Sequence, residues 1–570
     1  MVTAKAAAVF VEEYGILLEL SGANAFRVRA YANAVRALET LAAPLDDLLA
    51  AGTLTEVKGI GKSVGELVAE FAATDTAKAY EELRSSVPAG LLEMLRVPGL
   101  GPRKIIAIRE ELGIEDLDAL ARACDDGQLA SLKGFGKKTQ QNILKGIEYI
   151  RVHQGRFRAD IAHESAQSLR ETLAQLPQTG RMEVAGSLRR AKETVKDIDF
   201  VVSSTDPEAI AEAFVTHPDV AEILARDETK SAVRLHSGIQ ADLRVVADPE
   251  FPYVLHHCTG SVEHHVALRA RAQARGLKID EYGLYRDDKR IECDDEESFF
   301  AAMNLAHIPP ELRDGMGEIA AAEAGELPAL ITAADIRGML HVHSTYSDGA
   351  DTLADMASAI KERGYEYMGI ADHSQAAAYA GGLKVDAVKR QWEEIDQLNE
   401  KLAPFRIFKG IESDILTDGS LDYDDGILAQ FEYTVVSVHS QFNLDRAKMT
   451  TRIIRAIEHP AATIVGHLTG RLLLDREGYD VDVDQIIQAA AQRGVAIEIN
   501  AHPARLDIDW RHVKKARDHG VQIAINTDAH SIGGLDNLPY GIGIGRKGWL
   551  RAEDVPNALD TEAIAAWFQS

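Results

Sequence analysis

The C-terminal part of this sequence repeats one pattern, a short apolar run that ends in a residue able to bind a metal ion. Such runs end at His373, Glu412, His439 and His467, and the last one ends at Asp528 and His530. Short apolar strands separated by helical segments favour parallel strands in a closed barrel. The C-terminal ends of such strands meet at one mouth, so we expect these side chains to gather there.

The first of these strands carries the segment "HVHSTYSDG", in which His341 and His343 flank one residue and Asp348 follows. A single histidine at a strand end is more often a satisfied polar residue than a ligand. Here several separate strand ends carry one, which makes coincidence a poor explanation. Mixed imidazole and carboxylate ligands suit manganese or zinc, and a metal-bound water is a usable nucleophile near neutral pH.

This set of side chains resembles the metal pattern of the PHP (polymerase and histidinol phosphatase) phosphoesterase domain. All nine positions of the pattern are filled across residues 336–570, by His341, His343, Asp348, His373, Glu412, His439, His467, Asp528 and His530. The resemblance implies a distorted (β/α)7 barrel that holds up to three Mn²⁺ or Zn²⁺ ions. It also implies that Glu412 bridges two ions, that Asp528 faces the cluster, and that Asp348, His373 and His530 hold the third ion.

Two arginines near the predicted mouth are candidate phosphate contacts. Arg471 lies in "GHLTGR" and Arg505 in "AHPARLD". Solvated arginines are the equally simple alternative for both. His502, two residues past the strand "AIEIN", is either a substrate contact or a loop residue.

The chain length requires several cores, because 570 residues exceed one ordinary domain. No apolar run is long enough to span a bilayer, and no basic segment followed by an apolar one marks a secretory signal. Three scattered cysteines, Cys124, Cys258 and Cys293, form no metal or disulfide pattern, so we expect a reducing cytoplasm. The net charge of −27 argues only weakly against an anionic partner, because a basic domain can be present in a chain whose other domains are acidic.

The N-terminal part contains a turn pattern that occurs three times, in "VKGIGKS", "VPGLGPRK" and "LKGFGKK". Two glycines around one apolar residue permit a tight turn, and the amides after the second glycine lie at a helix start, a ready phosphate site. One such turn could be an ordinary helix connection, but three with basic followers resemble helix-hairpin-helix motifs, which bind the DNA backbone without reading sequence. The candidate DNA contacts are Gly59, Gly61, Lys62, Gly99, Gly101, Arg103, Gly134, Gly136 and Lys137.

The middle of the chain alternates strands and helices, and its chemistry lies in "VAGSLRRAKETVKDIDFVV". In the strand "KDIDFVV" the alternation places Asp197 and Asp199 on one face, and Asp242 lies in a later strand, "GIQADLRVV". Such carboxylates on adjacent strands would hold two magnesium or manganese ions about 3.5–4 Å apart, which can clamp the attacking and leaving oxygens of a phosphoryl transfer. Exposed surface acids are the alternative for a lone Asp-x-Asp.

A glycine–serine pair upstream favours the catalytic interpretation. Gly186 and Ser187 lie between a strand and a helical start, where a triphosphate could meet backbone amides, Ser187 and Arg190.

These motifs, together with "CTGSVEHHVALRARAQARGLKIDEYGLY", resemble the family X (DNA polymerase beta-like) DNA polymerases over residues 1–320. The resemblance implies that Asp197 and Asp199 bind both metals and that Asp242 helps to activate the primer 3′-hydroxyl. It also implies contacts to the incoming nucleotide or the template strand, made by Gly186, Ser187, Arg190, Thr259, Gly260, Ser261 and Arg269.

The sequence departs from the family pattern at several positions. His257 and Cys258 stand where two aromatics often precede Thr-Gly-Ser, which leaves the sugar selectivity open. Ala191 and Lys196 each replace a frequent glycine. Leu67 occupies the place of the lysine that forms a Schiff base in relatives with 5′-deoxyribose phosphate lyase activity, and leucine cannot form an imine.

We therefore predict a multidomain protein with an all-α helix-hairpin-helix region, an α+β nucleotidyltransferase palm and a C-terminal PHP barrel. The expected division is 1–90 (helical, first hairpin), 91–155 (helix-hairpin-helix subdomain), 156–257 (palm), 258–320 (nucleotide-selecting subdomain), 321–335 (linker) and 336–570 (PHP domain).

The combination predicts a cytoplasmic, monomeric DNA polymerase that fills short gaps in repair with deoxynucleoside triphosphates. The PHP domain would be a 3′–5′ exonuclease or another 3′-end-processing or abasic-site activity on gapped or nicked DNA. Two alternatives stay open, a polymerase fused to a small-molecule phosphatase and a non-catalytic scaffold that binds DNA ends.

Overall fold

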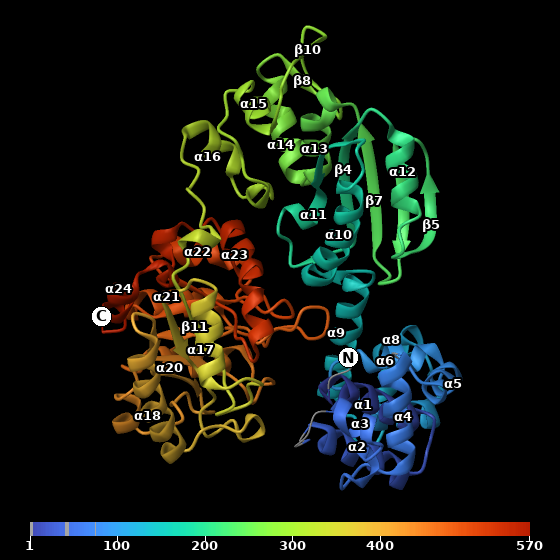
Figure 1. Ribbon diagram of the computed structural model, residues 1–570, viewed down its shortest axis with the longest axis vertical. Coiled ribbons are helices and arrows are strands. Elements are labelled where there is room, and N and C mark those ends of the chain that lie inside the picture. Colours follow the sequence, from blue (N-terminus) through green and yellow to red (C-terminus); the bar gives the residue numbers. More distant parts are fainter. Residues whose placement is uncertain (1–3, 40, 42–44, 75, 570) are drawn as a thin grey trace. The chain divides into compact units, whose positions relative to one another are not determined.

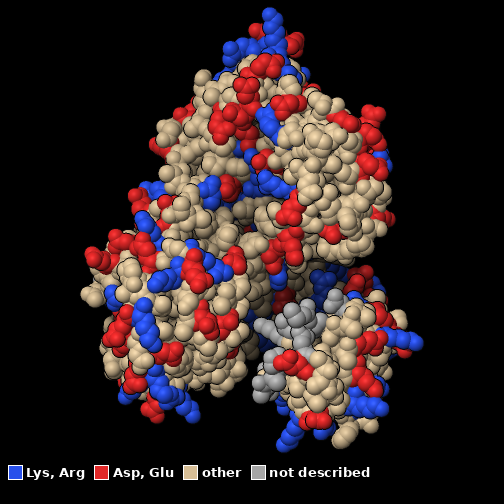
Figure 2. Space-filling model, in the orientation of Figure 1, with Lys and Arg blue, Asp and Glu red and all other residues tan. Residues whose placement is uncertain are grey.

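The computed structural model describes residues 4–39, 41, 45–74 and 76–569. The chain divides into two compact units, Met1–Gln154 and Gly155–Ser570, which Figure 1 colours from blue to teal and from teal to red. On the face visible in Figure 2, acidic and basic side chains are interspersed. Among the described residues, no helix combines the length and the apolar character that crossing a bilayer requires.

The first unit is helical, as predicted. Its helices are α1 (Ala4–Leu20), α2 (Ala25–Glu39), α3 (Leu45–Ala51), α4 (Lys62–Thr74), α5 (Lys78–Ser86), α6 (Ala89–Leu95), α7 (Pro102–Leu112), α8 (Leu117–Asp125) and α9 (Lys137–His153). One apolar core runs through all of this unit, because the helices contribute amphipathic faces to a common cluster.

The three repeated turns have the same local geometry. In each, the first glycine has a positive φ that favours glycine, with values of 105°, 77° and 90° at Gly59, Gly99 and Gly134. The apolar residue that follows is buried and its amide donates to the carbonyl three residues earlier, as seen at Ile60, Leu100 and Phe135. The second glycine directly precedes α4, α7 or α9. The predicted tight turn and helix start are therefore present in all three repeats.

The palm is a five-stranded sheet in the order β2-β4-β7-β6-β5, in which only β4 and β7 are parallel. Its elements are β1 (Phe157–Arg158), α10 (Ala159–Ala174), β2 (Thr179–Val184), α11 (Gly186–Arg189), β3 (Thr194–Val195), β4 (Asp197–Ser204), α12 (Pro207–Val215), β5 (Val220–Arg226), β6 (Lys230–Leu235) and β7 (Gln240–Val246). Helices α10 and α12 cover one face of this sheet, as Figure 1 shows. The other face packs against α13 (Phe251–Thr259), so the predicted α+β class is confirmed.

The segment 258–320, predicted to be a nucleotide-selecting subdomain, has a small core. It comprises α14 (Val262–Gln273), an antiparallel sheet of β8 (Leu277–Ile279), β9 (Leu284–Arg286) and β10 (Lys289–Ile291), and the helices α15 (Glu296–Ala301) and α16 (Glu318–Ala324). The segment 321–335, expected as a linker, includes the end of α16 and the fully buried Ile331.

The PHP domain consists of parallel strands with helices between them. The strands are β11 (Gly338–Val342), β12 (Tyr367–Ile370), β13 (Arg406–Phe408), β14 (Gly410–Asp414), β15 (Tyr433–Ser437), β16 (Ile464–Val465), β17 (Ala496–Asn500) and β18 (Ile523–Asn526). The helices are α17 (Leu353–Glu362), α18 (Val385–Leu402), α19 (Asp425–Leu428), α20 (Arg446–Ile457), α21 (Val483–Arg493), α22 (Trp510–Asp518), α23 (Leu538–Lys547) and α24 (Thr561–Trp567).

These strands form a three-stranded and a five-stranded sheet rather than one continuous ladder. Single parallel bridges join the two sheets: Val342 of β11 pairs with Ala529 after β18, and His373 after β12 pairs with Glu412 of β14. Apart from the partly buried Arg406 of β13, the strands are buried along their whole length, as expected for parallel strands covered by helices. Parallel pairing therefore brings the C-terminal strand ends to one side, although the ladders themselves stop short of a closed ring.

Candidate metal centres

The palm carboxylates lie on neighbouring parallel strands. Asp199 on β4 is directly opposite Asp242 on β7, and Asp197 is opposite Gln240. Burial alternates along β4, where Ile198 and Phe200 are buried in the core and the two aspartates are only partly buried. The structure therefore brings Asp197, Asp199 and Asp242 to one face of the sheet.

This face carries an excess of negative charge. Burial, followed by the charges of Asp197 and Asp242, raises the pKa of Asp199 to about 7. Burial also raises the pKa of Asp242, while hydrogen bonds of 3.0 Å from the Gln240 amide to both carboxylate oxygens oppose that rise. Divalent cations would relieve the repulsion between the three carboxylates, so this donor set fits the magnesium or manganese that the sequence predicts.

Gly186 allows the upstream turn to approach the carboxylates. A Cβ at this position would lie 2.0 Å from Oδ2 of Asp199, and Gly186 has a φ of 65°. The Ala185 amide donates to the Asp199 carbonyl at 2.8 Å. Only glycine can therefore place this turn against the acids.

Arg190 joins this turn to the predicted contacts at Thr259 and Gly260. Arg190 donates through Nη1 to the Thr259 carbonyl, and a Cβ on Gly260 would lie 2.9 Å from the same nitrogen. The hydroxyls of Thr259 and Ser261 have structural partners, since Thr259 donates to the Leu255 carbonyl and Ser261 caps α14. Ser187 is partly buried, and Arg269 is exposed on α14.

A cavity of about 400 Å³ opens beside the carboxylates. Among its lining residues are Asp199, Asp242, Lys230, Arg244, His257 and Cys258. His257 and Cys258, which depart from the expected aromatic pair, thus line the cavity next to the acids.

The nine predicted ligands of the PHP domain also converge. His341 and His343 lie at the end of β11, Glu412 lies within β14, and the remaining ligands follow strands or come from the loop after β11. Asp528 has a φ of 51°, a conformation uncommon outside glycine that is typical of functional sites.

Glu412 is at the centre of the cluster. His467 and His439 approach its Oε1 through Nε2 at 3.0 and 3.2 Å, and His373 approaches its Oε2 through Nδ1 at 2.8 Å. His341 and His343 lie 3.6 and 3.7 Å from the same carboxylate. This position between separate groups of imidazoles is what the expected bridging role requires.

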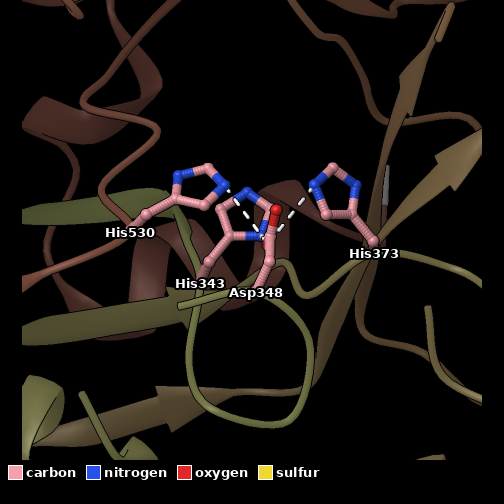
Figure 3. Close-up of side chains that lie close together, drawn as sticks. All are labelled: His343, Asp348, His373 and His530. Atoms are coloured by element: carbon pink, nitrogen blue, oxygen red, sulfur yellow. Dashed lines mark ion pairs between the residues drawn. The ribbon is translucent and has the colours of Figure 1, made fainter. Parts of the chain in front are cut away.

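Asp348 and Asp528 complete the cluster. The imidazoles of His530 and His373 point toward the Asp348 carboxylate from opposite sides, with Nε2 at 3.3 and 3.6 Å from Oδ1 (Figure 3). His343 lies between them, with Nδ1 at 3.9 Å from the same oxygen. Nε2 of His343 is also 3.1 Å from Oδ1 of Asp528.

The donor atoms fit metal ions. Three groups of side chains each bring ligand atoms within 4.8 Å of one another, namely His343, Asp348, His373 and His530, then His341, His343 and Asp528, then His373, Glu412 and His439. Buried nitrogens of His341, His343, His373 and His467 have no hydrogen-bond partner among the described residues. Burial, followed by the charge of His530, lowers the pKa of His343 to about 3, which keeps this imidazole neutral and able to bind a cation.

Two further acids orient the ligands and were not predicted from the sequence. Glu498 accepts from Nδ1 of His341 at 2.6 Å, and Asp414 pairs with Nδ1 of His439 at 2.6 Å. Such outer contacts fix which imidazole nitrogen faces the metal. A signal for Asp414 was present in the sequence, because it lies two residues after Glu412 on the same strand and so faces the same side.

The two candidate phosphate-binding arginines differ in position. Arg505 faces the cluster, with Nε 3.8 Å from Oδ2 of Asp528. Arg471 is engaged elsewhere, since it pairs with Asp509 at 2.8 Å and Glu193 at 3.4 Å and donates to two carbonyl groups. The structure therefore brings only Arg505 to the ligands. His502 lies in the loop after β17, and its Nδ1 accepts from the Ala504 amide at 3.2 Å.

The basic residues of the repeated turns lie at helix starts in the first unit. Lys62 has an ion pair of 3.8 Å with Glu66, and Arg103 reaches Glu19 at 3.3 Å while its side chain remains 93% exposed. Lys137, the first residue of α9, is exposed. All three side chains are therefore accessible to a phosphate backbone.

Comparison with known domain families agrees with these sites. Two helix-hairpin-helix families match residues 3–77 and 91–148, the DNA polymerase beta thumb family matches residues 254–314, and the PHP domain family matches residues 339–502. The fold and the two centres thus define a DNA polymerase of the beta type joined to a metal-dependent phosphoesterase.

Curated relatives identify the family more narrowly. The chain is 37% identical over 567 residues to the DNA polymerase/3′-5′ exonuclease PolX of Bacillus subtilis (strain 168), covering 98% of each protein. This chain belongs to the PolX family, the bacterial family X DNA polymerases with an attached PHP domain.

A different group of relatives resembles only a part of the chain. A probable phosphatase of Thermoanaerobacter sp. (strain X514) is 28% identical over 203 residues, which is 33% of this chain and 77% of that protein. A probable phosphatase of Clostridium acetobutylicum is 24% identical over 35% of this chain.

Proposed function

We propose that this protein is a DNA-directed DNA polymerase that fills short gaps during repair, and that its PHP domain trims 3′ ends as a 3′–5′ exonuclease. The observation that carries this proposal is the presence of two complete metal-ligand sets in one chain of the PolX family. A binding scaffold would need neither set. The likeness to probable phosphatases favours a second candidate for the PHP domain alone, the hydrolysis of a small phosphate monoester.

In the palm, Asp197 and Asp199 would hold two Mg²⁺ or Mn²⁺ ions, and Asp242 would face the primer 3′-hydroxyl. Bound ions would supply charge neutralisation for the attacking and leaving oxygens. Arg190 and Ser187 would orient the triphosphate, and the turn at Gly260 would lie beside the nucleotide sugar. The carboxylate of Asp242, with a raised pKa, is suited to attract the proton of the hydroxyl as it attacks the α-phosphorus.

In the PHP domain, the nine ligands would hold up to three Mn²⁺ or Zn²⁺ ions. Such ions supply an activated water and polarise the phosphodiester under attack. Glu498 and Asp414 would keep His341 and His439 in the ligating tautomer, and Arg505 would contact a phosphate oxygen. Cleavage would then release a nucleotide and leave a 3′-hydroxyl that the palm can extend.

The helix-hairpin-helix turns would bind the backbone of gapped or nicked DNA through their amides and through Lys62, Arg103 and Lys137. Residues 96–158 contain more lysine and arginine than aspartate and glutamate, which supports a local phosphate-binding surface in an acidic chain. We further propose that the protein acts as a cytoplasmic monomer, since each ligand set comes from a single chain and the substrate is DNA.

A primer extension and degradation assay on gapped DNA with manganese tests the proposal. Asp199→Ala should abolish extension and leave degradation, and His343→Ala should have the reverse effect. Hydrolysis of a phosphate monoester without any shortening of the DNA 3′ end would favour the phosphatase candidate. A wild-type protein that neither extends nor degrades DNA would favour the scaffold.

A further inference from the structure

A lysine of the PHP domain is buried against the predicted triphosphate-binding turn. Lys547 is the last residue of α23, and its side chain is 0% exposed. Its ammonium donates to the carbonyl of Arg190 at 3.0 Å and to that of Glu311 at 3.3 Å. It also donates to Oδ2 of Asp314, so one PHP side chain contacts both the palm and the nucleotide-selecting subdomain.

Asp314 is shared by three cations. Its Oδ1 lies 3.2 Å from Nζ of Lys192 and 3.4 Å from Nε of Arg190, while Lys547 contacts its other oxygen. The Asp314 side chain is only 6% exposed, and these three basic side chains are its ion-pair partners among the described residues. Lys192 and Lys547 each also lie 4.5 Å from the centre of the Trp510 ring on α22.

The surrounding packing fixes α23 against the palm. A Cβ on Gly543 would lie 3.2 Å from Cβ of Ala191, the residue that follows Arg190. Tyr540 of the same helix packs against the palm core, and Trp549 belongs to the core of the nucleotide-selecting subdomain. Contacts of α23 with the palm and of Trp549 with the nucleotide-selecting subdomain therefore fix the position of Lys547.

From this arrangement we infer that Lys547 is a positioning residue of the polymerase reaction, which allows Arg190 to leave Asp314 and turn to the incoming triphosphate. The inference rests on the proposed function, in which Arg190 binds that triphosphate. When the guanidinium moves away, the buried Asp314 carboxylate loses one of its three cations. Lys547 and Lys192 still compensate it, whereas without Lys547 the carboxylate would hold Arg190 more firmly.

The test is the Michaelis constant for a deoxynucleoside triphosphate in single-nucleotide gap filling by the full chain. Lys547→Met keeps the length of the side chain and removes its charge, and it should raise KM about ten-fold with kcat changed less than about two-fold. Hydrolysis of bis(p-nitrophenyl) phosphate by the PHP domain should stay within about two-fold of wild type. Lys448→Met, on the exposed surface of α20, is the matched control and should change neither quantity.

A second substitution should reverse the increase in KM. Adding Asp314→Asn to Lys547→Met removes the charge that retains Arg190, so KM should return to within about three-fold of wild type. A purely structural interface would instead lose more function with each change. If Lys547→Met unfolds the protein, Lys192→Met replaces it in both experiments. The Lys192 ammonium contacts the same carboxylate, and its side chain is 24% exposed.

An unchanged KM in Lys547→Met overturns the inference. So does a double variant whose KM is as high as that of Lys547→Met. A parallel loss of phosphoesterase activity in Lys547→Met also overturns it. Arg190→Ala separates this failure from that of the proposed function. If Arg190→Ala raises KM and Lys547→Met does not, only the positioning role is wrong. If Arg190→Ala leaves KM unchanged, the assignment of Arg190 to the triphosphate is wrong.

Discussion

At the residue scale, the partly buried Asp199 and the buried Glu412 illustrate how the surroundings of a carboxylate decide its protonation. Asp199 lies among other acids, and burial together with those charges raises its pKa to about 7. Glu412 lies among imidazoles, and although burial opposes ionisation, the charges of His439 and His373 hold its pKa well below the ordinary value. The palm centre therefore carries surplus negative charge around Asp199. In the PHP centre, the neighbouring histidines stabilise the negative charge of Glu412.

Cation binding to the palm should depend on pH through Asp199. Protons compete with the metal below the raised pKa of about 7, so affinity should increase as the pH rises toward 7 and then level off. For one competing proton, the apparent Kd for Mn²⁺ should increase about ten-fold for each pH unit below that value. Calorimetric titration in a His343→Ala background, which weakens the PHP site, measures this constant. A flat profile between about pH 5.5 and 7 would contradict the prediction.

Gly186→Ala should remove polymerase activity selectively. The new Cβ would lie 2.0 Å from Oδ2 of Asp199, at a backbone φ of 65° that alanine rarely adopts. Displacing the turn or the carboxylate by about 1 Å should lower the rate of extension about 100-fold or more. Gel-resolved extension and degradation assays measure both activities, and degradation should be retained. Gly494→Ala, in a PHP loop where a Cβ would meet nothing within 4 Å, is the control for a glycine with positive φ.

Glu498→Gln should weaken metal binding in the PHP domain. The carboxylate accepts from Nδ1 of His341 at 2.6 Å, and an amide at this position would no longer favour the ligating tautomer. We expect the apparent affinity for Mn²⁺ to fall about 10- to 100-fold, as measured by reactivation of the apoprotein. Primer extension should be unaffected. Equal losses of both activities would indicate a folding defect instead.

At the scale of elements, the turns and the strand ends were the most predictable features. The Gly-apolar-Gly turns were predictable because their geometry depends on adjacent residues, as the buried Ile60 and its following helix show. Parallel strands that end in ligands were also predictable, because each apolar run and the ligand residue at its end are adjacent in the sequence. The split into two sheets joined by single bridges was not predictable, because strand register depends on contacts between distant segments.

The helix-hairpin-helix turns should contribute salt-dependent DNA binding. Replacing Lys62 or Lys137 by glutamine removes one phosphate contact, so the slope of log K against log salt concentration should decrease by about one unit for each substitution. Fluorescence anisotropy with gapped DNA of two unrelated sequences measures this slope, and both sequences should respond alike. Lys78→Gln, an exposed lysine of the same unit, is the control. A change for one sequence only would contradict backbone binding.

At the scale of the whole molecule, partners far apart in the sequence limited the prediction. Arg471 was a candidate phosphate contact, with a solvated arginine as the equal alternative, yet it pairs with Glu193, which lies 278 residues away. The contact of Lys547 with Asp314 spans 233 residues and gives no local signal. In contrast, all nine predicted ligands converge in the structure, because each of them lies near the end of a parallel strand or in the loop that follows one.

Removal of the metal should lower the thermal stability of the second unit. Without bound ions, buried imidazole nitrogens of His341, His343 and His467 have no hydrogen-bond partner among the described residues. Chelation followed by calorimetry should lower Tm by about 5–10 °C, and added Mn²⁺ should restore it. The shift should persist in Asp199→Ala, which alters only the palm. An unchanged Tm would contradict a loaded PHP centre.

The contact between Lys547 and the Arg190 turn has a practical consequence for anyone who wishes to separate the two activities. Shortening the gene so that its product ends before β11 would delete the trimming centre, but it would also expose Ala191, Asp314 and the apolar surface that Tyr540 and Trp549 cover. A synthesis-only enzyme should therefore be made by substituting single ligands such as His343 and keeping the full-length chain.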